Sequence, residues 1–91
     1  MNKSFKNMRT AVIGVGSMGQ NHALVYDKIS NLVAIADTNE INGQKIANRF
    51  GIDWYSDYHD IFDKVDAVSI AVPTVNHREV AEAAAKKGIH I

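Results

Sequence analysis

Three glycines, Gly14, Gly16 and Gly19, directly follow a short apolar run and precede a segment with helical spacing. Glycines at these intervals permit a tight turn, a close approach of the backbone to a ligand, and close packing of a helix against a strand. The pattern alone often arises by chance. Between a strand and a helix, however, it stands where a parallel β-α-β unit needs it. This position constrains the fold more than any other feature of the sequence.

Short apolar runs alternate with longer amphipathic segments through the rest of the chain, which is typical of a parallel sheet with crossover helices. Strands are expected at residues 10–15, 32–37 and 66–72, with a short edge strand near 52–55 and another strand beginning at 89–91. Helices are expected at residues 17–29, 39–50, 57–64 and 75–87. The sequence therefore predicts an α/β fold, a doubly wound parallel sheet of the Rossmann type, truncated in about the fifth strand.

The first predicted helix has a recognisable apolar stripe. Met18, His22, Val25 and Ile29 recur at helical spacing and are expected to face the sheet. On such a face, His22 is expected to be a core histidine with a hydrogen-bond partner.

The expected domain organisation is simple: residues 1–9 form a disordered lead-in, and residues 10–91 form one partial α/β domain. Ten basic and ten acidic side chains balance, which argues against nucleic-acid binding. The absence of cysteine excludes disulfides and thiolate catalysis. No apolar run approaches a membrane span, and the polar lead-in does not resemble a signal peptide. A cytoplasmic location, away from membranes, is expected.

The start of the first predicted helix is the expected phosphate site. There, the N–H groups of Ser17 and Met18 would point at a pyrophosphate, beside the backbone of Gly14 and Gly16 and with the support of the helix dipole. A glycine-rich turn without a ligand is the alternative interpretation.

Asp37 strengthens the dinucleotide interpretation, because it ends the second predicted strand 18 residues after Gly19. An acidic residue at roughly this offset holds the adenosine ribose in dinucleotide-binding folds. Its charge would also repel a 2′-phosphate, at a cost on the order of 4 kcal/mol for unit charges about 4 Å apart. The neighbouring Thr38 offers no positive charge to offset it. NAD is therefore expected in preference to NADP, although Asp37 could instead cap the next helix.

The turn after the third long strand should face the glycines, because strand order reverses at this point of a doubly wound sheet. Pro73 ends the strand and Thr74 can cap the following helix. We expect Pro73 and Thr74 to border the nicotinamide ribose, with His77 behind them. Strand termination and capping without a ligand remain the alternative, and His77 alone fits a structural role better than proton transfer.

Two other clusters are given structural interpretations. The acidic side chains around His59, among them Asp57 and Asp60, are expected to form a solvated surface and not a metal site. The aromatic group Trp54, Tyr55 and Tyr58 is interpreted as packing near the edge strand, with bordering of the adenine as the alternative.

Four segments together resemble one known family: residues 14–22, Ala36–Asp37, residues 55–58 and residues 72–77. They are similar to the amino-terminal domain of the glucose–fructose oxidoreductase, inositol dehydrogenase and MocA family. The resemblance runs from about Thr10 to Ile91. It implies an NAD(P)-dependent oxidoreductase that acts on a secondary alcohol of a sugar, cyclitol or nucleotide sugar, and a full-length protein that forms a homo-oligomer.

The resemblance also implies which functions this chain can carry. Family members typically continue into a Glu-Lys-Pro motif with a catalytic lysine and then into a substrate domain. Residues 10–91 are therefore expected to be a partial dinucleotide-binding domain without its substrate domain; no catalytic residue is expected here, and the chain alone is expected to be inactive. Its expected cofactor contacts are Gly14, Gly16, Ser17, Met18, Asp37, Thr38, Pro73, Thr74 and His77. The alternatives are a stand-alone dinucleotide-sensing module, or another Rossmann dehydrogenase class. A Glu-Lys-Pro sequence directly after Ile91 would favour the enzyme.

Overall fold

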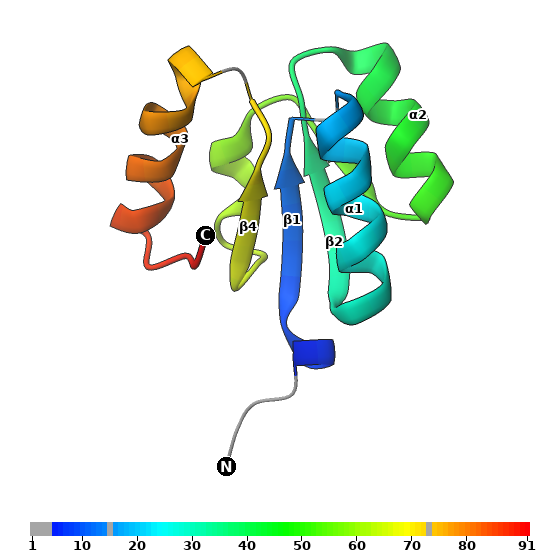
Figure 1. Cartoon of the computed structure of the whole chain (residues 1–91), viewed down its shortest axis with the longest axis horizontal. Helices are drawn as coiled ribbons and strands as arrows, with labels where there is room; N and C mark the ends of the chain where they lie inside the picture. The colour runs from blue at the N-terminus through cyan, green and yellow to red at the C-terminus, as the bar shows by residue number, and fades with distance from the viewer. Residues whose placement is uncertain (1–4, 15, 73) are drawn as a thin grey trace.

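The computed structural model describes residues 5–14, 16–72 and 74–91, and contains one parallel sheet in the order β3-β2-β1-β4 (Figure 1). The strands are β1 (Arg9–Ile13), β2 (Asn31–Ala36), β3 (Asp53–Tyr55) and β4 (Ala67–Ile70). An isolated parallel bridge joins His90 to Ala67, where the sequence predicts a fifth strand to begin. The predicted doubly wound parallel sheet is confirmed.

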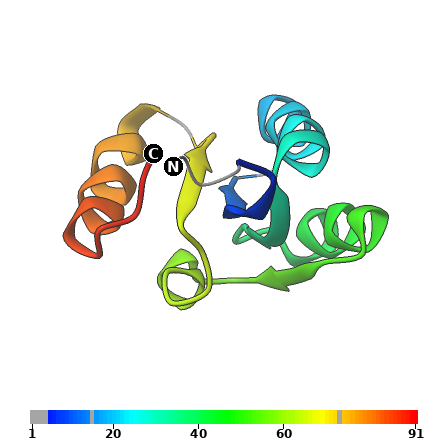
Figure 2. The ribbon, with the colours of Figure 1, turned by 90° about the horizontal axis from the view of Figure 1, so that it is seen from below.

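The helices cover both faces of this sheet (Figure 2). On one face lie α1 (Ser17–Ile29) and α2 (Glu40–Phe50). On the other lie the 3-10 helix η2 (Tyr58–Ile61) and α3 (Thr74–Lys86). Ahead of the sheet, the lead-in contains a short 3-10 helix, η1 (Phe5–Asn7), and β1 already includes Arg9. None of the helices in the described ranges is long and apolar enough to cross a membrane.

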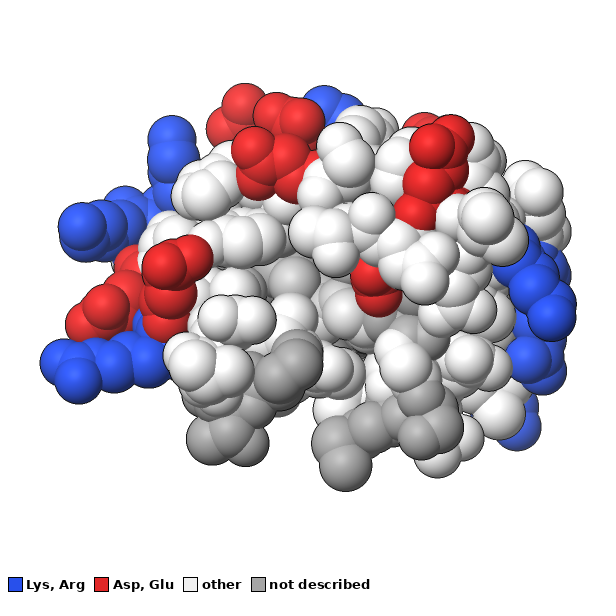
Figure 3. Space-filling view, turned by 90° about the horizontal axis from the view of Figure 1, so that it is seen from above, with Lys and Arg blue, Asp and Glu red and all other residues white. Residues whose placement is uncertain are grey.

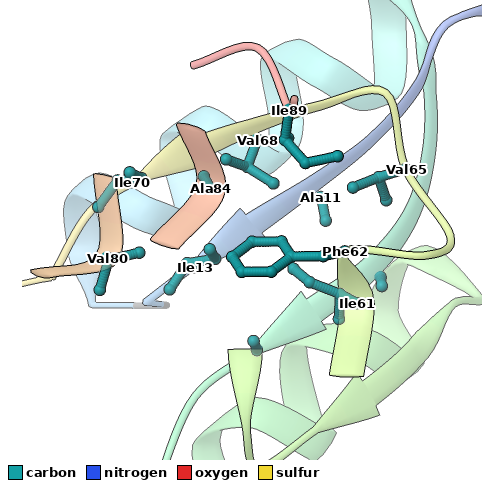
Figure 4. Close-up of a cluster of buried hydrophobic side chains, with 12 residues drawn as sticks. Ala11, Ile13, Ile61, Phe62, Val65, Val68, Ile70, Val80, Ala84 and Ile89 are labelled. Atoms are coloured by element: carbon teal, nitrogen blue, oxygen red, sulfur yellow. The ribbon is translucent and has the colours of Figure 1, made fainter. Parts of the chain in front are cut away.

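The core follows the alternation of side chains along β1, because successive residues of a strand point to opposite faces. Ala11 and Ile13 belong to the larger cluster, under η2 and α3, whereas Val12 packs with Ala23 of α1. Figure 4 shows the larger cluster, in which Phe62, just beyond η2, approaches Ile13. Its members are Ala11, Ile13, Ala34, Ala36, Ile61, Phe62, Val65, Val68, Ile70, Val80, Ala84 and Ile89.

The apolar face predicted for the first helix is wrong at two of its four positions. Ala23 is fully buried, whereas Val25 is 51% exposed and Ile29 is 43% exposed. The reason is Gly19, where an added Cβ would overlap the carbonyl group of Gly14. Since Gly19 and Ala23 lie one turn apart, these small residues form the contact line with the sheet. Larger apolar side chains are left on the flanks.

Helix ends follow local chemistry. The side chain of Asn39 caps α2 by accepting a hydrogen bond from the N–H of Asn42 at 3.0 Å, and the helix ends at Gly51 in the left-handed region. The helix predicted over residues 57–64 is shorter than expected and is a 3-10 helix. Asp57 precedes it and accepts hydrogen bonds from the backbone and side chain of His59, which lower the pKa of its carboxyl group.

Candidate functional site

A cavity of about 650 Å³ opens at the carboxyl ends of the strands. Figure 3 looks onto this end of the molecule, where most Lys and Arg side chains lie at the left and right margins, and acidic side chains lie at the left, along the top and near the centre. The volume is in the range of small-molecule and cofactor sites. The cavity is lined by Ile13, Gly14, Gly16, Ala36, Asp37, Thr38, Ser56, Tyr58, Ala71, Val72, Asn76, Glu79 and Val80.

Gly14 forms the turn where the chain leaves β1. Its φ of +92° lies in a region that L side chains rarely adopt, and its N–H donates to the carbonyl oxygen of Ala36 at 2.8 Å. A Cβ at this position would lie 2.8 Å from the carbonyl oxygen of Ala71, beyond the end of β4. The ends of β1 and β4 therefore approach each other so closely that a side chain is excluded between them.

The N-terminus of α1 opens at this cavity, and its N-cap residue supplies no side-chain cap. Its N-cap residue is Gly16, which makes no capping hydrogen bond through a side chain, and the first helical bond runs from Gln20 N–H to the Gly16 carbonyl. Helix geometry leaves the N–H groups of Ser17, Met18 and Gly19 without acceptors inside the helix. Their partial positive charge and the helix dipole favour an anion here. The α2 N-terminus, by contrast, is capped by its own Asn39.

Asp37 lines the same cavity from the end of β2 and is half-buried. Its N–H donates to the carbonyl oxygen of Tyr55 at 3.0 Å, and its Oδ1 atom accepts a hydrogen bond from the N–H of Asn39 at 2.7 Å. The first bond continues the pairing of β2 with β3, and the second fixes the rotation of the carboxylate. The carboxylate thus has a defined position at the rim, beside Thr38.

Another wall of the cavity comes from the segment after β3, from η2 and from α3. The hydroxyl group of Tyr58 donates to the Glu79 carboxylate at 3.5 Å, which links η2 to α3. Desolvation raises the pKa of the Tyr58 hydroxyl, and the negative charge of Glu79 raises it further. Ser56 and Asn76 contribute polar groups to the same wall. This side of the cavity therefore offers one aromatic ring and several hydrogen-bonding groups.

The structure brings Gly14, Gly16, Asp37 and Thr38 to one cavity, as the sequence predicts. Ser17 and Met18 open α1 and Thr74 opens α3, but their side chains lie outside the description, as does all of Pro73. His77 is exposed on α3 and is not one of the lining residues.

Sequence reasoning missed the lining residues on α3, which are Asn76, Glu79 and Val80. Their spacing of three and four positions places them on one side of a helix that follows a strand of the crevice. That spacing was the available signal. Within the described residues, no three His, Asp or Glu side chains are placed to hold a metal ion.

Comparisons with known proteins fit this geometry. Residues 8–91 match the model of a family described as an oxidoreductase family with an NAD-binding Rossmann fold. UDP-N-acetylglucosamine 3-dehydrogenase from Acidithiobacillus ferrooxidans is 39% identical over 92% of this chain and 27% of its own length. Myo-inositol 2-dehydrogenase from Thermotoga maritima is 34% identical over 92% of this chain and 27% of its own length.

The solved structures agree with these sequence matches. The structure of the Acidithiobacillus enzyme superposes with a TM-score of 0.88, covering 92% of this chain and 28% of that one. A levoglucosan dehydrogenase in complex with NADH and L-sorbose superposes with a TM-score of 0.82 at 34% identity, covering 93% of this chain and 26% of that one. The chain thus spans about a quarter of the length of the relatives it matches.

Proposed function

The chain belongs to the oxidoreductase family with the NAD-binding Rossmann fold, and we propose that it binds NAD in the cavity at the carboxyl ends of β1, β2 and β4. In this proposal the chain is the nucleotide-binding domain of a dehydrogenase that acts on a secondary alcohol of a sugar, cyclitol or nucleotide sugar. Relatives with such substrates by name support the substrate class.

The observation that carries the proposal is the pairing of two groups at one cavity. Helix α1 starts after Gly16, and this N-cap residue makes no side-chain capping bond. Asp37 presents its carboxylate at the rim of the same cavity. The first suits a pyrophosphate, and the second suits ribose hydroxyl groups. A mononucleotide phosphate site would need the first feature alone. The two together favour a dinucleotide with an adenosine ribose that carries no 2′-phosphate.

Each half of the nucleotide has a proposed place. The pyrophosphate would contact the backbone of Gly14, Gly16, Ser17 and Met18. The adenosine ribose would contact Asp37 and Thr38, and the adenine would lie toward Tyr58. The nicotinamide ribose would lie by the turn that contains Pro73 and Thr74, and His77 is proposed as a more distant contact on α3.

These positions indicate which part of catalysis the cofactor would supply and which part the protein would supply. The nicotinamide supplies the hydride chemistry when it is bound, and the protein must orient it and accept the substrate proton. The residues of this chain bind and orient the nucleotide. In the proposal, substrate recognition and proton transfer belong to the part of the enzyme that corresponds to the remaining length of the relatives.

Calorimetric titration with NADH, NADPH and ADP-ribose tests the proposal directly. NADH and ADP-ribose should bind with a stoichiometry of one, and NADPH should bind at least tenfold more weakly because Asp37 repels its 2′-phosphate. Absence of binding by all three ligands would refute the nucleotide site. Equal binding of NADH and NADPH would refute the assigned role of Asp37.

A further inference from the structure

We propose that Trp54 is a positioning residue for nucleotide selectivity, because its indole holds the turn that places the Asp37 carboxylate. The inference rests on the proposed function, since it concerns the same cavity. Trp54 is not one of the residues that line this cavity, so it acts through Asp37 and not on the nucleotide. The sequence alone indicates only a packing role for this side chain.

The contact that carries the inference is a hydrogen bond from the Trp54 side chain to the backbone of Asp37. The indole Nε1–H donates to the carbonyl oxygen of Asp37 at 2.9 Å. The N–H of Asp37 donates to Tyr55 at 3.0 Å, so β3 holds both backbone polar groups of this residue. Strand β3 ends at Tyr55. The indole therefore supplies a donor just beyond the last paired residue of a three-residue edge strand.

The indole is itself fixed from behind by α2. A Cβ added at Gly43 would overlap the Cδ1 and Nε1 atoms of the Trp54 ring, so helix and ring are in direct contact. The ring also packs against the cluster formed by Ile35 and Ile46. A ring in contact with a helix on one side and with the sheet core on the other has little freedom to move. Its N–H therefore points to Asp37 in a defined direction.

The turn transmits this position to the carboxylate. Asp37 Oδ1 accepts from the N–H of Asn39, and Asn39 in turn caps α2. The orientation of the carboxylate thus depends on the backbone between Asp37 and Asn39, and Trp54 binds the carbonyl oxygen of Asp37 in this segment. If that bond is lost, the carboxylate moves relative to the cavity. The displaced carboxylate then forms weaker hydrogen bonds to the ribose hydroxyl groups and repels a 2′-phosphate less strongly.

Trp54→Phe tests this inference, with Tyr55→Phe as the matched control on the same strand. Trp54→Phe removes the N–H donor and keeps an aromatic ring, whereas Tyr55→Phe removes a hydroxyl group and leaves the Trp54 bond in place. Calorimetry should show that Trp54→Phe weakens NADH binding about fivefold, the size of one net hydrogen bond. The ratio of the NADPH and NADH dissociation constants should fall by at least that factor, and Tyr55→Phe should keep the wild-type ratio.

The ratio separates positioning from a general loss of structure. Partial unfolding would weaken both nucleotides equally and leave the ratio unchanged, which would overturn the inference. Gly43→Ala provides a second perturbation, because its methyl group would push the indole from the α2 side. It should lower the ratio in the same direction. Failure of the wild-type chain to bind NADH would instead refute the proposed function, so the two failures are distinguishable.

The chain contains one tryptophan, so its indole N–H gives a single signal in a proton–nitrogen NMR spectrum. This measurement needs no variant and remains decisive if the substitutions prevent folding. The signal should exchange with solvent more slowly than that of a free indole, and it should shift on saturation with NADH although Trp54 does not line the cavity. Rapid exchange, or no shift at saturation, would overturn the inference.

Discussion

The Nδ1 atom of His22 and the Oγ atom of Ser69 are hydrogen-bonded to each other, and this contact joins α1 to β4. The imidazole is half-buried on the side of α1 that faces the sheet. The hydrogen-bond partner expected for His22 is therefore confirmed, but the side chain is half-buried and does not belong to the buried core. Helix α1 begins at the cavity and β4 ends there. The contact between His22 and Ser69 therefore also fixes two walls of the cavity relative to each other.

A double-mutant cycle with His22→Ala and Ser69→Ala should measure this contact. Each single variant should lower the free energy of unfolding by about 1–2 kcal/mol, because it leaves a partly buried polar group without its partner. The double variant should be more stable, by roughly 0.5–1.5 kcal/mol, than the sum of the two single losses of unfolding free energy predicts. Urea unfolding followed by circular dichroism gives all four values. Strict additivity would show that the two side chains do not interact.

Gly14→Ala and Gly16→Ala should separate stability from binding. Alanine at Gly14 meets a positive φ and a backbone oxygen at 2.8 Å, so the free energy of unfolding should fall by roughly 2 kcal/mol or more. At Gly16 an added Cβ has no neighbour within 4 Å, so the free energy of unfolding should fall by only about 1 kcal/mol, the cost of alanine at a helix N-cap. That methyl group would nevertheless enter the proposed pyrophosphate site. NADH titration should therefore show a loss of at least tenfold for Gly16→Ala.

Asp37→Asn should change the nucleotide preference with little change of shape, because asparagine keeps an oxygen that can accept from the N–H of Asn39. Replacing charge-assisted bonds to the ribose with neutral ones should weaken NADH binding about tenfold. NADPH should bind as well as before or more tightly. Asp53→Asn, at the exposed start of β3, is the control and should leave both dissociation constants unchanged. An unchanged preference in Asp37→Asn would argue against ribose recognition.

The fold could be predicted because the sequence patterns that indicate its strands and helices are local and recur along the chain. Apolar runs separated by helical patterns define β1, β2 and β4, and the glycine spacing identifies the turn after β1. The buried line of α1 could not be predicted in the same way. Apolar periodicity selects the largest side chains, whereas Gly19 and Ala23 form the buried line because the helix approaches the sheet so closely.

Part of the cavity lining was also hard to predict from the sequence, for a different reason. Gly14, Gly16, Asp37 and Thr38 stand at strand ends whose order in the sheet follows from the topology. The contact between Tyr58 and Glu79 depends on how η2 and α3 meet over the sheet, and the helical spacing of Glu79 with Asn76 and Val80 gives no information about that meeting. The bond from Trp54 to Asp37 likewise joins residues through tertiary packing.

Tyr58 should contribute its ring, and not its hydroxyl group, to adenine binding. Tyr58 lines the same cavity as Asp37, while its hydroxyl group is bonded to Glu79. Tyr58→Ala should therefore weaken ADP-ribose binding at least about fivefold, because stacking of a base on an aromatic ring contributes about 1 kcal/mol or more. Tyr58→Phe keeps the ring and should stay within about twofold of the wild type, since it loses only a long and exposed hydrogen bond. Calorimetry on both variants gives the comparison, with circular dichroism to establish that they are folded. Equal losses in the two variants would assign the effect to the link between η2 and α3 and would remove the adenine from this wall.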